Sequence, residues 1–197
     1  RVHLVCLGTM SFGSMSSEAT AHDILDEYVE LGGNFIDTAE MYPVPTDPKL
    51  TGESERILGR YLKVRPGLRE KLVIATKVAG PGYGGASAQV HTARERDLGG
   101  DTSKYPLKND LSDAQIRRAV DASLARLQID TIDLYQVHWP ERAVPLWGES
   151  QYTPSMEARN VRLHADGCAF ERIARTMGAL IAEGKVREWG LSNETSF

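Results

Sequence analysis

Residues 8–13 read Gly8-Thr9-Met10-Ser11-Phe12-Gly13, and they follow an apolar run, Leu4 to Leu7, that we expect to form the first strand. A doubly wound sheet that binds a dinucleotide would carry Gly-x-Gly-x-x-Gly at this turn, where glycine lets the backbone approach the pyrophosphate closely. This stretch fails that pattern, because Met10 stands in place of the second glycine. The first turn therefore argues against a dinucleotide-binding doubly wound fold.

Outward from this turn, strand and helix patterns alternate along the chain. Later strands are expected at residues 34–37, 72–77, 132–138 and 186–191, and helical periodicity covers residues 18–31, 53–62, 114–127 and 170–184. Five strands joined by four crossover helices fit either an open doubly wound sheet or the first five strands of a (β/α)8 TIM barrel. Long connections at residues 79–110 and 139–165 favour the barrel, because the loops after its strands build the site.

Local signals mark several boundaries. Ser17 is a plausible N-cap of the first helix, and the sequence Ser112-Asp113-Ala114-Gln115 reads as a capping box. The Gly-rich stretch from Pro81 to Gly85 has no following Gly-Lys-Ser/Thr, so we expect a flexible loop and not a phosphate cradle. The inward face of the last helix is predicted to include Phe170, Ile173, Ala174, Met177 and Ile181.

The composition fits one soluble globular domain over residues 1–197, since 41% of the residues are apolar and 25% are charged. A net charge of -4 gives no basic surface for nucleic acid, and no apolar run approaches the ~20 residues that span a bilayer. We therefore expect no nucleic-acid partner and no membrane. The expected location is cytoplasmic, with an organelle left open. Cys6 and Cys168 lack metal-ligand spacing and read as reduced core or near-core thiols.

No metal site is predicted. The four histidines without ligand spacing are expected at surface or loop positions: His3, His22, His91 and His164. The chain opens on Arg1 and stops just after the fifth expected strand, so we expect it to be part of a longer protein. If these residues were the whole protein, the unpaired edges of an open barrel should cause it to aggregate, dimerise or borrow strands.

Polar residues stand where three successive strands end. Asp37 follows Asn34-Phe35-Ile36, Lys77 closes residues 72–77, and His138 closes residues 132–138. Parallel strands bring these ends to one edge, where ligands bind. Tyr42 lies five residues after Asp37. Each residue alone has an ordinary structural explanation, but together the four predict a site that donates a proton.

The chain resembles the aldo-keto reductases, most closely their bacterial Tas-like branch. The resemblance covers nearly the whole chain and rests on five segments in order: residues 7–13, 35–43, 75–77, 133–140 and 190–193. It implies a (β/α)8 barrel of which strands six to eight are missing here. It also implies a catalytic tetrad of Asp37, Tyr42, Lys77 and His138.

The resemblance further implies that NADP(H) is the cofactor, with NAD(H) left open. The cofactor-binding positions that it maps onto this chain are Gly8, Thr9, Met10, Asp37, Ser192 and Asn193. The implied substrate is a small molecule with an aldehyde or ketone carbonyl. Aromatic candidates for the pocket wall are Phe12, Tyr83, Trp139 and Trp147.

Carbonyl reduction needs hydride delivery to carbon and a proton for the oxygen. Tyr42 would supply the proton, Lys77 would lower the pKa of the phenol, and Asp37 would hold Lys77 in place. His138 would bond and orient the carbonyl oxygen. The same residues would also fit a second hypothesis, in which a catalytically weak reductase-like barrel serves as a binding subunit of a larger assembly. Homo-oligomerisation stays open as well.

Overall fold

The computed structural model describes residues 1–80, 85–100, 110–142, 144–145, 151–156 and 169–194. Its strands form one parallel sheet in which the spatial order follows the chain order. They are β1 (Leu7–Gly8), β2 (Phe35–Asp37), β3 (Val73–Val78), β4 (Ile132–Val137) and β5 (Val186–Leu191). Each crossover therefore advances by one strand in the same direction, as in a (β/α)8 barrel.

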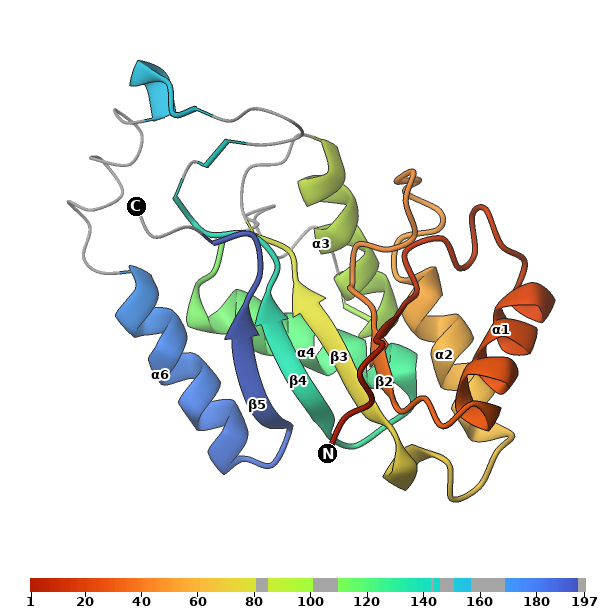
Figure 1. The fold of residues 1–197 in the computed structure, drawn as a ribbon. Helices are drawn as coiled ribbons and strands as arrows, with labels where there is room; N and C mark the ends of the chain where they lie inside the picture. Colours follow the sequence, from red (N-terminus) through yellow and green to blue (C-terminus); the bar gives the residue numbers. More distant parts are fainter. Residues whose placement is uncertain (81–84, 101–109, 143, 146–150, 157–168, 195–197) are drawn as a thin grey trace.

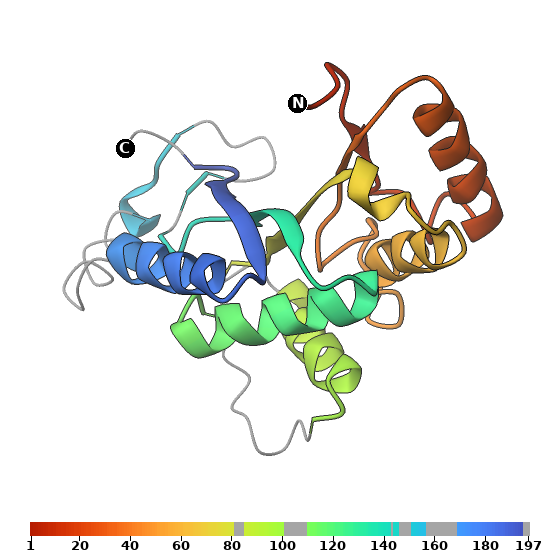
Figure 2. The ribbon, with the colours of Figure 1, turned by 90° about the horizontal axis from the view of Figure 1, so that it is seen from below.

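The helices cover one side of this sheet. They are α1 (Glu18–Glu30), α2 (Glu53–Lys63), α3 (Gly85–Asp97), α4 (Asp113–Leu127) and α6 (Ala169–Ala182), with the 3-10 helix η1 (Arg69–Lys71) before β3. Figures 1 and 2 show them around the outer side of the curved sheet, and none of the described helices lies on the inner side. The predicted partial barrel of five parallel strands is confirmed; the four predicted crossover helices correspond to α1, α2, α4 and α6, and α3 is additional.

Side chains of the strands alternate between the two faces of the sheet. Ile36, Ile74 and Tyr135 face the helices and are fully buried in the main core. The register pairs Asp37 with Ala75 and Lys77 with Gln136, so Asp37, Lys77 and Gln136 share the inner face. The same alternation that builds the core therefore directs the polar side chains into the barrel interior.

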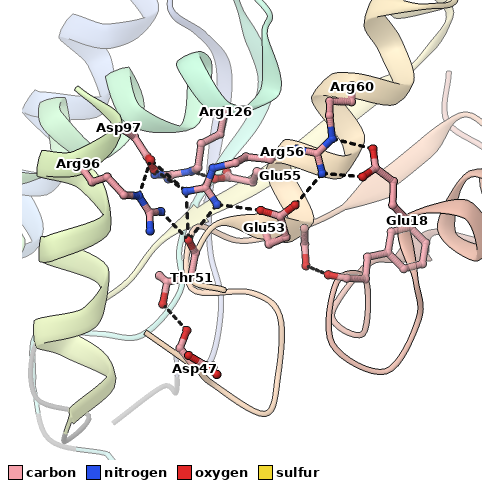
Figure 3. Close-up of polar contacts among 12 residues, drawn as sticks. Glu18, Asp47, Thr51, Glu53, Glu55, Arg56, Arg60, Arg96, Asp97 and Arg126 are labelled. Carbon is pink, nitrogen blue, oxygen red and sulfur yellow. Dashed lines mark hydrogen bonds and ion pairs between the residues drawn. The ribbon is translucent and has the colours of Figure 1, made fainter. Parts of the chain in front are cut away.

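Helix α3 lies inside the connection 79–110, which the sequence analysis left without a helix. The segment has no apolar stripe, and buried charges attach it to its neighbours. Figure 3 shows Asp97 of α3 between Arg56 of α2 and Arg126 of α4, with N–O distances of 3.0 and 2.8 Å. A prediction from hydrophobic periodicity could not detect a helix that docks through ion pairs.

The first strand is shorter than predicted. Only Leu7 and Gly8 pair with β2, whereas Leu4 and Val5 are exposed. Cys6 is also exposed, so its assignment as a core or near-core thiol was wrong; Cys168 lies outside the described residues. This end of the sheet has no packing partner among the described residues that would bury the apolar run.

Capping was predicted correctly at one helix and incorrectly at another. The Ser17 hydroxyl accepts a hydrogen bond from the Thr20 N–H, which confirms the N-cap of α1. Ser112 occupies the N-cap of α4 but makes no side-chain cap bond, so the predicted capping box is not formed. The side-chain oxygen of Gln115, Oε1, instead accepts a hydrogen bond from Arg94 Nη1 at 3.1 Å.

In α6, Ile173 and Met177 are buried as expected. Phe170 and Ile181, predicted to face inward, are 50% and 37% exposed. They lie at the margins of the stripe that packs on β5, so the buried face of α6 is narrower than the sequence pattern indicated.

Candidate active site

Three elements of the sheet bring the predicted catalytic residues to one edge. Asp37 ends β2, Lys77 is the penultimate residue of β3, and His138 directly follows β4. The His138 N–H donates to Val78 O at 3.0 Å, which extends the β3–β4 pairing by one residue. The carboxyl ends of three neighbouring parallel strands therefore hold an acid, an amine and an imidazole side by side.

An ion pair joins the first two of these residues. Lys77 Nζ lies 2.5 Å from Asp37 Oδ2 and also donates to Thr38 O at 2.8 Å. Gln136 Nε2 donates to the other carboxylate oxygen, Asp37 Oδ1, at 3.2 Å. Because Lys77 is only 5% exposed, these contacts fix the direction of its ammonium group.

Tyr42 comes from the loop after β2 and lies against both Lys77 and His138. The Lys77 nitrogen is 5.1 Å from the centre of the Tyr42 ring, within cation–π range. The Tyr42 and His138 rings meet edge to face, with centroids 5.7 Å apart. The structure therefore brings all four residues of the predicted tetrad together.

Burial sets the protonation of the two aromatic acid–base groups. It raises the pKa of Tyr42 to about 12, with the negative charge of Asp37 adding to the effect. This direction is opposite to the lowering by Lys77 that the sequence argument expected. Burial, reinforced by the charge of Lys77, lowers the pKa of His138 to about 3. At neutral pH the phenol therefore carries its proton and the imidazole is uncharged.

The turn after β1 lies beside Asp37. Thr9 is fully buried, and both its N–H and its hydroxyl donate to Asp37 O, at 3.0 and 3.1 Å. Gly8 pairs with Asp37 across the β1–β2 ladder. Met10 is half exposed, and its carbonyl accepts from the Val44 N–H. Two of the predicted cofactor positions, Gly8 and Thr9, thus adjoin Asp37, and Met10 bonds the loop that carries Tyr42.

Ser192 and Asn193 extend the pairing of β5 with β4. The Ser192 N–H donates to Val137 O, and Asn193 Nδ2 donates to His138 O, both at 2.8 Å. Asn193 adopts a left-handed conformation with φ of 54°, which asparagine tolerates better than most residues. The turn therefore places these two predicted cofactor positions directly beside His138.

The predicted aromatic wall is only partly present. Trp139 stacks on His138 with ring centroids 6.1 Å apart, whereas Tyr83 and Trp147 lie outside the described residues. Phe12 is 2% exposed in the hydrophobic core, so its assignment to a pocket wall was wrong. The Phe12 side chain packs into the core although the residue lies in a turn, and the sequence pattern did not reveal this.

Sequence reasoning missed two polar residues around the tetrad. Gln136 was read only as part of a strand, and its bond to Asp37 depends on the β3–β4 register. Glu40, inside the motif that carries Asp37 and Tyr42, is 1% exposed and pairs with Arg94. Its position in that motif was the one available signal.

His91 was expected at a surface or loop position, and this expectation was wrong, because the residue is buried on α3.

Within the described part of the chain, no group of three or more histidine, cysteine or acidic side chains could hold a metal ion. None of the described helices combines the length and apolar character needed to cross a bilayer.

Comparison with known proteins identifies the class to which this partial barrel belongs. The family model of the "Aldo/keto reductase family" matches residues 4–196, and the chain belongs to this family. Among its curated relatives, Protein tas of Escherichia coli is 42% identical over 193 residues, which are 97% of this chain and 48% of that protein. Norsolorinic acid reductase stcV of Emericella nidulans is 33% identical, over 98% of this chain and 40% of its own length.

A solved structure shows the same relationship. An aldo-keto reductase from Bacillus halodurans, in its holo form, matches with a TM-score of 0.62 and 29% sequence identity. The match covers 98% of this chain and 46% of that one. The chain thus spans about half the length of the relatives that it matches.

Proposed function

We propose that this chain is the catalytic N-terminal part of an NADPH-dependent reductase that converts aldehyde or ketone carbonyls to alcohols. The observation that supports this most strongly is the packing of Tyr42 against both the Lys77–Asp37 ion pair and His138. Membership of the aldo/keto reductase family agrees with the proposal. The preference for NADPH over NADH is part of the proposal.

In this mechanism Tyr42 is the general acid. Its raised pKa keeps the phenol protonated, and the adjacent Lys77 ammonium stabilises negative charge that develops as the proton leaves. Asp37 holds Lys77 toward the ring. His138 is neutral, so it can donate a hydrogen bond to the carbonyl oxygen of the substrate without taking up the proton that Tyr42 supplies.

The residues beside the tetrad fit a nicotinamide. Both observed hydrogen bonds of the Asn193 side chain use its nitrogen, so its oxygen is the group that can accept from a carboxamide. The Nδ1 atom of His138 is buried and lacks a partner among the described residues, which suits a site completed by a ligand. Ser192, Asn193 and the Gly8–Met10 turn would hold the cofactor, which supplies the hydride.

The test replaces Tyr42 by Phe and follows nicotinamide oxidation with a panel of aldehydes and ketones. Because this change removes only the proton donor, kcat should fall by roughly 10²-fold or more while the fold is unchanged. Tyr61→Phe is the control. It removes another buried phenol, one that donates to Asp26 at 2.8 Å outside the site, and should leave kcat as it is.

A Tyr42→Phe variant that turns over as fast as the parent protein would exclude the proposed acid. A complete absence of nicotinamide-dependent turnover, together with stoichiometric binding to a partner, would favour the alternative function as an assembly subunit. Both experiments should use the full-length protein wherever the natural chain is longer than these residues.

A further inference from the structure

Glu40 is a buried carboxylate two residues before Tyr42 in the chain. Arg94 of α3 donates two hydrogen bonds to this carboxylate, from Nε to Oε2 at 2.8 Å and from Nη2 to Oε1 at 2.5 Å. The Ala79 N–H at the end of β3 donates to Oε1 at 2.6 Å. Glu40 and Arg94 are each 1% exposed. The carboxylate thus joins three segments: the Tyr42 loop, the end of β3 and α3.

Such a pair is an unusual choice if stability is its only purpose. Removing two charges from water costs free energy that their attraction repays only when the geometry is good, and apolar replacements often serve equally well. The bidentate geometry here fixes direction as well as distance, because a guanidinium fork meets both oxygens of one carboxylate. This points to positioning of what Glu40 is attached to.

A small apolar cluster lies beside the pair. Ala39, Met41 and Ala79 pack with Val90 of α3, and the partly buried Tyr42 ring lies against them. The backbone adds two constraints, since the Glu40 N–H donates to Lys77 O at 3.3 Å and the Tyr42 N–H donates to Ala39 O at 3.0 Å. Movement of Glu40 would therefore be passed directly to Tyr42.

We infer that Arg94 is a positioning residue, which holds the Tyr42 phenol against Lys77 and His138 through its bidentate grip on Glu40. This inference rests on the proposed function, and it gives α3 a role in the reaction. Arg94 touches none of the tetrad side chains in the contacts described above. Its effect on the reaction is exerted through Glu40 and the loop.

The first test needs no turnover. Arg94→Met should accelerate hydrogen exchange of the Ala79 amide and of the amides in residues 39–44 by roughly 10-fold or more, because their anchor is lost. Arg118→Met is the matched control. Arg118 donates two hydrogen bonds to Glu95, which follows Arg94 in α3. The Nε–Oε1 distance is 2.7 Å and the Nη2–Oε2 distance is 2.5 Å. Arg118→Met should leave exchange in the Tyr42 loop unchanged.

A double variant distinguishes the loss of loop positioning from unfolding of the whole protein. Arg94→Met removes the bidentate partner of Glu40 and leaves Arg126, whose Nη2 lies 3.9 Å from Oε2, as the remaining cation beside it. The double variant Glu40→Gln with Arg94→Met removes both charges of the bidentate pair and keeps an oxygen for the Ala79 N–H. The double variant should fold, yet the Tyr42 loop should still exchange quickly, since its charged link to α3 is lost and only the apolar contact with Val90 remains. Normal loop exchange in the double variant would overturn the inference and leave the pair a purely structural feature.

The kinetic test separates positioning from substrate binding. Misplacement of the acid should lower kcat by about 10- to 100-fold with KM nearly unchanged, and Arg94→Lys should restore part of the rate because it keeps the charge. Equal rates in Arg94→Met and the parent protein would overturn the inference. If Tyr42→Phe has no effect while loop exchange responds to Arg94, the proposed function fails and the anchoring of the loop stands.

Discussion

The imidazole of His138 is the residue whose protonation the fold changes most clearly at the site. Its pKa drops from 6.5 to about 3 on folding, because burial and the charge of Lys77 disfavour the charged form. Between these two values the unfolded chain binds a proton that the native site does not. The contribution of His138 to stability is therefore intact above pH 6.5 and declines as the pH falls toward 3.

We predict that this linkage is measurable by urea unfolding at neutral pH and near pH 5. His138→Gln should reduce the acid-induced loss of stability by about 2 kcal/mol relative to the parent protein. His3→Gln, at an exposed histidine near the N-terminus, is the control substitution. If the parent and His138→Gln lose equal stability on acidification, the imidazole is not held neutral by its surroundings.

At the scale of the elements, α2 and α4 cross at a point where only glycine fits. A Cβ atom built on Gly59 of α2 would lie 2.3 Å from Arg126 O and 2.9 Å from Leu127 O. Both are backbone atoms, which cannot move aside as a flexible side chain can. Beside this crossing, Arg126 of α4 forms ion pairs with Glu55 of α2 and with Asp97 of α3.

Gly59→Ala should therefore destabilise the protein by about 1–3 kcal/mol, although alanine is the better helix former. Gly178→Ala in α6 is the matched control, because a Cβ atom there meets nothing within 4 Å. It should be neutral or stabilising by up to about 1 kcal/mol. Thermal or urea unfolding of both variants decides the question. Equal effects would show that helix propensity, and not the close crossing, determines the outcome.

Helices α3 and α4 show how far element prediction could go. The start of α4 was located correctly from Ser112, yet the Gln115 side chain bonds Arg94 instead of closing the capping box. Helix α3 was missed altogether because its buried contacts are charged: Arg94 with Glu40, and Glu95 with Arg118. A burial pattern made of charged residues reads in the sequence as a solvated surface or a loop.

For the whole molecule, the open sheet is the dominant physical feature. Among the described residues β1 and β5 each pair on one side only, and apolar side chains near them are exposed, including Leu4 and Leu191. Unpaired strand edges that carry apolar residues are templates for association. A polypeptide of these 197 residues is therefore expected to self-associate with increasing concentration.

Sedimentation velocity over a range of concentrations provides the test. Leu4→Lys should shift the distribution toward monomer, because charge on an edge opposes strand pairing. Val64→Lys is the control, since Val64 is also exposed but lies at the C-cap of α2, outside the sheet. A monomeric parent protein at every concentration would contradict the expectation.

The sequence by itself determined the order of the five strands and of four of the helices, the parallel sheet, and the position of Asp37, Lys77 and His138 where strands end. These features have a local or periodic signature: alternating apolar runs, and polar residues placed where strands end. Tertiary structure alone decided that Gln136 reaches Asp37, that α3 docks through buried ion pairs, and that burial raises the pKa of Tyr42. Each of these three features depends on atoms brought together from distant positions and on the loss of water around them. The spacing of residues along the chain records neither the contacts nor the loss of water.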